Sequence, residues 1–141
     1  LYRTAGLSQL IDLNGLELRC LGTVGSYVYA VVDSSVYKIT VNNLTKTASS
    51  SLIGTISSST GPVKMAANPT QIVWVDGTAT GYIYTPGSET FATINSSDSD
   101  FTGGTDVVFF DGYFVVSVPN TGRMWGCCFC SIYGRHFNLA R

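Results

Sequence analysis

The chain has 141 residues, of which 45% are apolar and 12% are charged, and its formal net charge is −1. This length and apolar content exclude a disordered segment and allow one domain with a hydrophobic core. With no basic run, the chain has no electrostatic footprint for nucleic acid, and its apolar runs are too short to span a bilayer.

Residues 1–15 contain one short helix-like patch without a cap, and we expect them to form an irregular lead-in. From Leu16 the pattern changes to short β-strands separated by turn residues. The last strand of this first group follows a loop rich in Ser and Thr. The predicted strands are Leu18–Val24, Tyr27–Asp33, Val36–Val41 and Leu52–Ile56.

The same order of strands and turns then recurs twice. Asp76-Gly77 and Asp111-Gly112 are strong turn signals, because Gly adopts positive φ without steric cost. A polar loop, Asn95–Asp100, separates the second group from the third. The second group has the predicted strands Val63–Ala67, Gln71–Asp76, Gly81–Thr85 and Thr90–Ile94, and the third has Thr105–Phe110, Tyr113–Val118 and Gly122–Trp125.

Aligning the second strands of the groups places Tyr27, Gln71 and Tyr113 in register, with offsets of 44 and 42 residues. Four short strands at such a period are typical of β-propeller blades. The prediction is an all-β fold of antiparallel blades, with a sandwich or barrel as the alternative. The blades are expected at about 16–57, 61–95 and 103–125, followed by a divergent tail, 126–141. Three blades do not close a ring, because propellers have about 4–8, so we expect an incomplete propeller.

Neither the histidine nor the cysteines form a pattern with a known chemistry. His136 is the only histidine, and it is interpreted as a solvent-exposed residue of the tail. Cys127, Cys128 and Cys130 do not have zinc-ribbon spacing, and Cys20 is isolated. Reduced thiols are the expectation, with no metal and no cofactor.

The acidic residues are interpreted as turn residues. Asp33, Asp76 and Asp111 each lie in or beside a turn, where an Asp side chain accepts hydrogen bonds from backbone N–H groups. A pair of catalytic carboxylates is the weaker interpretation. Asp98 and Asp100 lack calcium-loop spacing. Asn43 and Asn95 are formal glycosylation acceptors, relevant only in a secreted chain.

The large aromatic side chains fall at strand positions, where a ring usually belongs to the core between blades. A platform for sugar stacking is the alternative. No phosphate loop, nucleophile elbow or Cys/His pair is present. The residues indicate a binding or structural module and not an enzyme, with no catalytic site. The aromatic residues in question are Tyr27, Tyr29, Tyr37, Tyr82, Tyr84, Trp74 and Trp125.

The central stretch, Gly61–Tyr84, resembles the packaged DNA stabilisation proteins of short-tailed bacteriophages and related prophages. The resemblance covers about residues 16–125 and is weakest upstream, where Val28-Tyr29, Val36-Tyr37 and Leu52–Ile56 fit loosely. Its most specific residues are Gly61-Pro62-Val63, Met65-Ala66, Asn68, Thr70-Gln71, Val75-Asp76-Gly77 and Gly81-Tyr82-Ile83-Tyr84, followed by Phe101, Gly103, Val107, Phe110–Phe114, Pro119 and Thr121-Gly122.

This resemblance implies a β-propeller tail hub, or nozzle, and no catalytic residues. Such proteins assemble in several copies below the portal and adaptor, extend the DNA channel and help to retain the packaged genome. They also bind tail needle and tail spike proteins. The chain is therefore expected in the virion tail, assembled in the bacterial cytoplasm as a homo-oligomer, enclosing DNA without specific binding and without inserting into a membrane. The alternative is a propeller that binds a glycan or another ligand.

The chain departs from the family in two respects. Family members are longer, and this chain begins with Leu1, so we expect a fragment or a processed product. From Gly126 onward the sequence, GCCFCSIYGRHFNLAR, no longer fits the family pattern. A frameshift or rearrangement in a decaying prophage gene is our hypothesis, and sequencing the surrounding DNA tests it.

Overall fold

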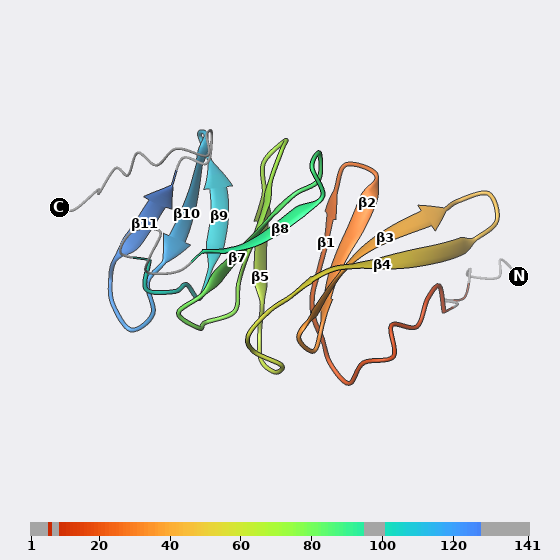
Figure 1. Cartoon of the computed structure of the whole chain (residues 1–141), viewed down its shortest axis with the longest axis horizontal. Helices are drawn as coiled ribbons and strands as arrows, with labels where there is room; N and C mark the ends of the chain where they lie inside the picture. Colours follow the sequence, from red (N-terminus) through yellow and green to blue (C-terminus); the bar gives the residue numbers. More distant parts are fainter. Residues whose placement is uncertain (1–5, 7–8, 95–100, 128–141) are drawn as a thin grey trace, which may run out of the picture.

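A computed structural model describes residues 6, 9–94 and 101–127 of the chain. Within these residues the regular structure consists of β-strands, which form three antiparallel sheets without a helix. The sheets stand side by side along the longest axis of the molecule (Figure 1). None of them is closed on itself, and the predicted all-β class of separate antiparallel sheets is confirmed.

Each sheet is a meander in which consecutive strands are neighbours. The first sheet has the order β1-β2-β3-β4, the second β5-β6-β7-β8 and the third β11-β10-β9. The strands are β1 (Leu18–Val24), β2 (Tyr27–Val32), β3 (Ser35–Asn42), β4 (Thr47–Thr55), β5 (Lys64–Ala67), β6 (Ile72–Val75), β7 (Gly81–Thr85), β8 (Thr90–Ile94), β9 (Val107–Phe110), β10 (Tyr113–Ser117) and β11 (Met124–Cys127).

The predicted and observed strands differ most at β4. The sequence predicts a strand from Leu52 and a loop over the preceding Ser/Thr-rich segment. In the structure β4 begins at Thr47, which pairs with Asn42 at the end of β3. Thr is favoured in strands, and the long β3 offers a partner for each residue of the segment. The polar residues therefore extend a hairpin.

Strand β6 explains how the sheets pack, because both of its faces are buried. Ile72 and Trp74 point into a core shared with the first sheet, and Val73 and Val75 point into a second core shared with the third sheet. All four side chains are at most 1% exposed. This continuous apolar strand alternates between two cores, as expected where neighbours cover both faces of a sheet.

The first strands of the three sheets lie nearest one another, since β5 contacts both β1 and β9. Sheets that meet at their first strands and are stacked face to face have the arrangement of propeller blades. The loop expected at Asn95–Asp100 lies outside the described residues. Residues 101–104 follow it, and Gly77 N donates a hydrogen bond to Gly104 O at 2.9 Å, which joins the second sheet to the start of the third.

Candidate assembly surfaces

Most of the aromatic residues singled out in the sequence belong to the core between the first two sheets. Tyr29, Trp74, Tyr82 and Tyr84 are at most 1% exposed. The ring of Tyr29 lies 6.2 Å from that of Trp74 and 6.1 Å from that of Tyr84, measured between centroids, and both pairings join the first sheet to the second. Rings buried in this way hold the sheets together and offer no platform for a sugar.

The other aromatic residues lie closer to the surface. Tyr27 is 38% exposed at the start of β2, and Tyr37 is half-buried on the face of the first sheet that points away from the second. Trp125 of β11 is also half-buried.

The turn acids bind neighbouring backbone groups. Asp33, with φ of 50°, accepts hydrogen bonds from the amides of Leu16 and Glu17, at 3.1 and 2.9 Å for the closer oxygen of each. These bonds hold the two residues before β1 against the β2–β3 turn. Asp111, with φ of 48°, lies with Gly112 in the β9–β10 turn.

Asp76 joins two loops at the junction of the first and second sheets. Its carboxylate accepts hydrogen bonds from the hydroxyl of Ser58 and the hydroxyl of Thr78, both at 2.6 Å. The amides of the same two residues also donate to it. Burial opposes the charged form, but these four hydrogen bonds outweigh it and lower the pKa of Asp76.

Arg19 organises the same junction, and no sequence pattern pointed to it. Its side chain is 8% exposed, and all five N–H groups of the guanidinium donate at 2.7–2.8 Å. The acceptors are the carbonyls of Asp33, Ser58, Thr60 and Gly61 and the hydroxyl of Ser58. The pairing of β1 with β2 is irregular between Leu18 and Cys20. Arg19 lies at this irregularity and has no residue of β2 opposite it. A lone Arg between two apolar residues is the only sequence signal for this role.

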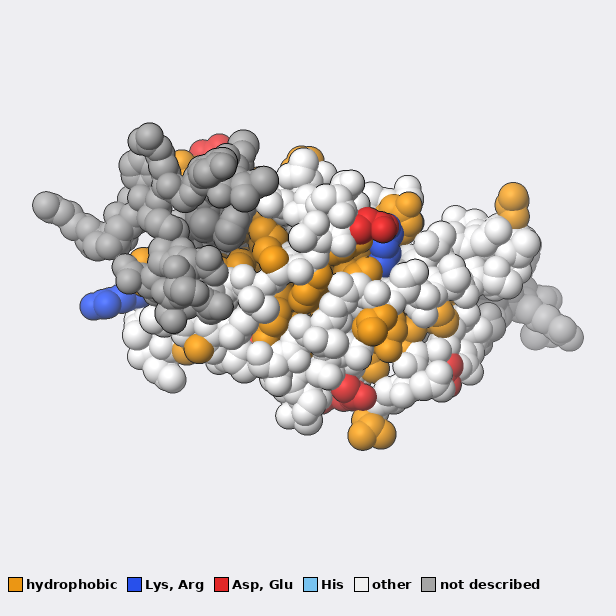
Figure 2. All heavy atoms as spheres, in the orientation of Figure 1, with side chains coloured by type: hydrophobic (Ala, Val, Ile, Leu, Met, Phe, Trp, Pro, Cys, Tyr) orange, Lys and Arg blue, Asp and Glu red, His pale blue; other side chains and the backbone are white. Residues whose placement is uncertain are grey.

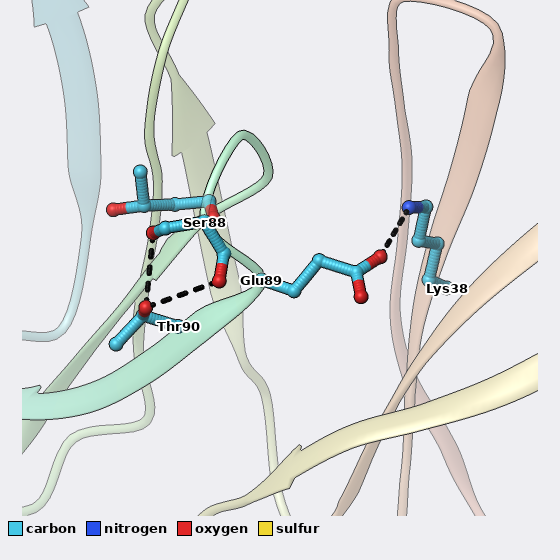
Figure 3. Close-up of polar contacts among 5 residues, drawn as sticks. Lys38, Ser88, Glu89 and Thr90 are labelled. Atoms are coloured by element: carbon cyan, nitrogen blue, oxygen red, sulfur yellow. Dashed lines mark hydrogen bonds and ion pairs between the residues drawn. The ribbon is translucent and has the colours of Figure 1, made fainter.

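A groove of about 360 Å³ opens between the first and second sheets beside β4. Lys38 of β3 lies in it, and its Nζ donates to Glu89 Oε1 at 3.5 Å, across the groove (Figure 3). The same Nζ lies 4.3 Å from the centroid of the Tyr27 ring. Burial disfavours the charge, but the hydroxyls of Tyr84, Tyr27 and Tyr29 and the contact with Glu89 raise the pKa of Lys38.

Two sheet faces at the ends of the stack are apolar and open. The third sheet exposes Phe110 at 74%, Met124 at 68% and Val108 at 53% on the side away from the second sheet. The first sheet exposes Leu21 and Leu52 at 63% and 59%. Charged side chains are few on the face drawn in Figure 2, where hydrophobic patches lie among uncharged side chains and backbone. Surfaces of this kind are typical of interfaces.

The remaining sequence candidates form no site in the described part of the chain. Cys20 is a free, half-buried thiol, and its pKa is raised by burial. No group of three His, Cys, Asp or Glu residues suitable for a metal occurs among the described residues. Asn43 is exposed between β3 and β4. The candidates His136, Cys128, Cys130, Asn95, Asp98 and Asp100 lie outside the described residues.

Within the described residues there is no helix with the length and apolar content needed to cross a membrane. A phage stabilisation family model, described as bacteriophage P22 Gp10, β-propeller, matches residues 1–127 of the chain. The match includes the lead-in and ends one residue after Gly126, where the sequence departs from the expected pattern. No curated protein matches this sequence.

Proposed function

Because this chain belongs to the bacteriophage P22 Gp10 family of packaged DNA stabilisation proteins, we propose that it is a structural component of a phage tail hub, or nozzle. In this role it assembles below the portal and adaptor as a homo-oligomer, extends the DNA exit channel and helps to retain the packaged genome. Its location is the virion tail, and assembly takes place in the host cytoplasm. The proposal assigns it no catalytic activity.

The observation that carries this proposal is the pair of open apolar faces at the two ends of a stack of sheets. The internal junctions bury the same kinds of side chain that the open faces expose: Val73 and Phe114 are at most 1% exposed, whereas Phe110 is 74% exposed. An exposed apolar sheet face of this kind is suited to packing against another sheet. We propose that the three sheets are propeller blades, at about 16–57, 61–95 and 103–125, and that neighbouring parts of the assembly cover the open faces.

The charge pattern supports steric containment of DNA and not phosphate binding. The chain carries eight Lys and Arg residues against nine Asp and Glu residues, and Arg19 directs its donors to carbonyl and hydroxyl groups of the chain itself. Proteins that bind DNA by its phosphates need a cluster of free cations. A ring formed by this protein would therefore enclose DNA without specific contacts. Its protein partners are the portal adaptor, the tail needle and the tail spike.

The test is co-sedimentation of the purified chain with portal–adaptor complexes of a short-tailed phage. The expected result is that the chain migrates with the complex in a stoichiometric band, and that its solution mass by light scattering corresponds to a discrete oligomer. A full-length member of the family is the positive control. If the control sediments with the complex and this chain remains monomeric at the top of the gradient, the proposed role is wrong.

A further inference from the structure

We propose that β4 and the groove beside it form a docking site for an extended strand of a partner protein, and that this strand carries an acidic side chain which enters the groove. The backbone of the partner would continue the first sheet beyond β4. Its carboxylate would bind Lys38. Two separate features of the structure, the edge of β4 and the chemistry of the groove, lead to this site.

The free edge of β4 has none of the charges or prolines that usually protect such an edge. β4 is the last strand of its sheet and pairs only with β3. It has nine residues, TASSSLIGT, with no charged residue and no proline, whereas the edge strand of the second sheet, β8, has five. Its register with β3 is regular from Thr47 to Leu52. Unpaired N–H and C=O groups along a long, uncharged edge are a template for an added strand.

The groove lies beside the same strand. Ser51 of β4 pairs directly with Lys38 of β3, and both residues line the groove. Adjacent strands are roughly 4.8 Å apart, so the residue of an added strand opposite Ser51 would lie two strand spacings from Lys38. Because the Ser side chain is short, an Asp or Glu side chain at that position can extend over it toward the Lys38 ammonium group.

The groups in the groove can donate more hydrogen bonds than they now make. Lys38 is 17% exposed, and its contact with Glu89 is long, at 3.5 Å, to a side chain that is 75% exposed. An ion pair of this kind contributes little, and Figure 3 shows Glu89 reaching it from a loop of the second sheet. The hydroxyl of Tyr84, which also lines the groove, is buried and has no hydrogen-bond partner among the described residues. A carboxylate would supply acceptor oxygens to a region that has excess donors.

A peptide fits these features better than a nucleic acid. A β-ladder needs alternating amide donors and carbonyl acceptors along the ligand, which a phosphate backbone lacks. A single lysine partly paired with Glu89 also gives little attraction for a polyanion. This docking goes beyond the proposed virion role, and a peptide titration on the isolated chain gives an answer whether or not the chain enters particles.

The test is fluorescence anisotropy with a labelled heptapeptide of alternating Thr and Val that has a central Glu. Matched peptides carry Gln in place of Glu, or N-methyl groups on every backbone amide. We expect the Glu peptide to bind about tenfold more tightly than the Gln peptide, as for one charge-assisted contact. The N-methylated peptide should not bind, because it cannot extend the sheet. Lys38→Met should reduce affinity for the Glu peptide to that of the Gln peptide, whereas Lys46→Met, in the β3–β4 turn, should leave it unchanged.

Hydrogen exchange of the unmodified chain provides a second measurement that needs no variant. Peptide binding should protect the amides of Thr47–Leu52 and leave those of β8 unaffected. Equal binding of the N-methylated peptide, or protection at β8 and not at β4, would overturn the proposal. Equal affinity for the Glu and Gln peptides, with protection at β4, would overturn the role given to Lys38.

Discussion

Tyr29 of β2 and Trp74 of β6 meet between the first and second sheets, with their ring centroids 6.2 Å apart and their planes inclined at 57°. Neither residue is more than 1% exposed, and Tyr84 completes the contact from β7. Tilted aromatic pairs at this distance add to the stabilisation from burial alone. The junction of the two sheets is thus a core in its own right, and its loss would separate the sheets.

The first prediction compares two tyrosines of the same sheet. Tyr29→Ala should lower the free energy of unfolding by about 3–5 kcal/mol, because it leaves a cavity at the junction. Tyr37→Ala, on the half-buried opposite face, should cost only about 1 kcal/mol. Denaturant unfolding followed by tryptophan fluorescence measures both. Equal costs would show that the junction is not the main core.

Arg19 provides the second prediction. Arg19→Met should cost about 3 kcal/mol, because it removes the buried guanidinium whose part-buried hydrogen bonds hold the carbonyls of Ser58, Thr60 and Gly61. Arg19→Lys should recover only part of this stability, since an ammonium group cannot supply five donors in a planar arrangement. Arg123→Met, at an exposed position near β11, is the control and should change stability by less than about 0.5 kcal/mol. If Arg19→Lys were as stable as the wild type, the planar arrangement of five donors would not be needed for this role.

Much of the fold follows from the sequence because its signals are local. The bounds of β1, β7 and β8 are those expected from alternation and from the turns at their ends. The extension of β4 was missed because it depends on pairing with β3, which is a property of the sheet and not of the residues Thr47–Ser51. Arg19 and the Lys38 groove were missed for a similar reason. Both involve residues more than 35 positions apart, such as Arg19 with Gly61 and Lys38 with Glu89, so no local pattern contains them.

The third prediction concerns the contact between the second and third sheets. Gly103 has φ of 96°, and a Cβ at this position would lie 2.0 Å from the carbonyl oxygen of Thr78. Gly103→Ala should therefore cost at least about 2 kcal/mol, from the backbone conformation and the clash together. Gly87→Ala, where a Cβ would meet nothing within 4 Å, is the matched control. In thermal unfolding, Gly103→Ala should melt at a lower temperature than Gly87→Ala. Equal melting temperatures would show that the segment around Gly103 can move to accommodate a Cβ.

Asp76 predicts a dependence of stability on pH. Burial acts against its charged form, but hydrogen bonds from Ser58 and Thr78 outweigh that effect, and they hold the pKa of Asp76 below its usual range. A carboxyl group with a lowered pKa in the folded state stabilises the fold above the unfolded pKa, and the contribution is lost as the pH falls through the folded pKa. The wild type should therefore lose more stability than Asp76→Asn between about pH 6 and about pH 3. Denaturant unfolding at several pH values measures both proteins. If they lose the same free energy of unfolding over this range, Asp76 does not have the lowered pKa.

The last prediction addresses the open face of the third sheet. Phe110 is 74% exposed there beside Val108 and Tyr113, so wild-type chains should associate through this face in solution. Phe110→Glu places a charge at the most exposed large apolar residue of this face and should shift the solution mass toward the monomer without changing the far-UV spectrum. Leu44→Glu adds the same charge at a residue that is 95% exposed in the β3–β4 turn, away from this face, and should leave the mass unchanged. Light scattering after size exclusion measures the solution mass of all three proteins. A smaller mass for Phe110→Glu alone identifies the third sheet as an assembly surface, whereas equal masses for all three proteins would mean that association, if present, uses another part of the molecule.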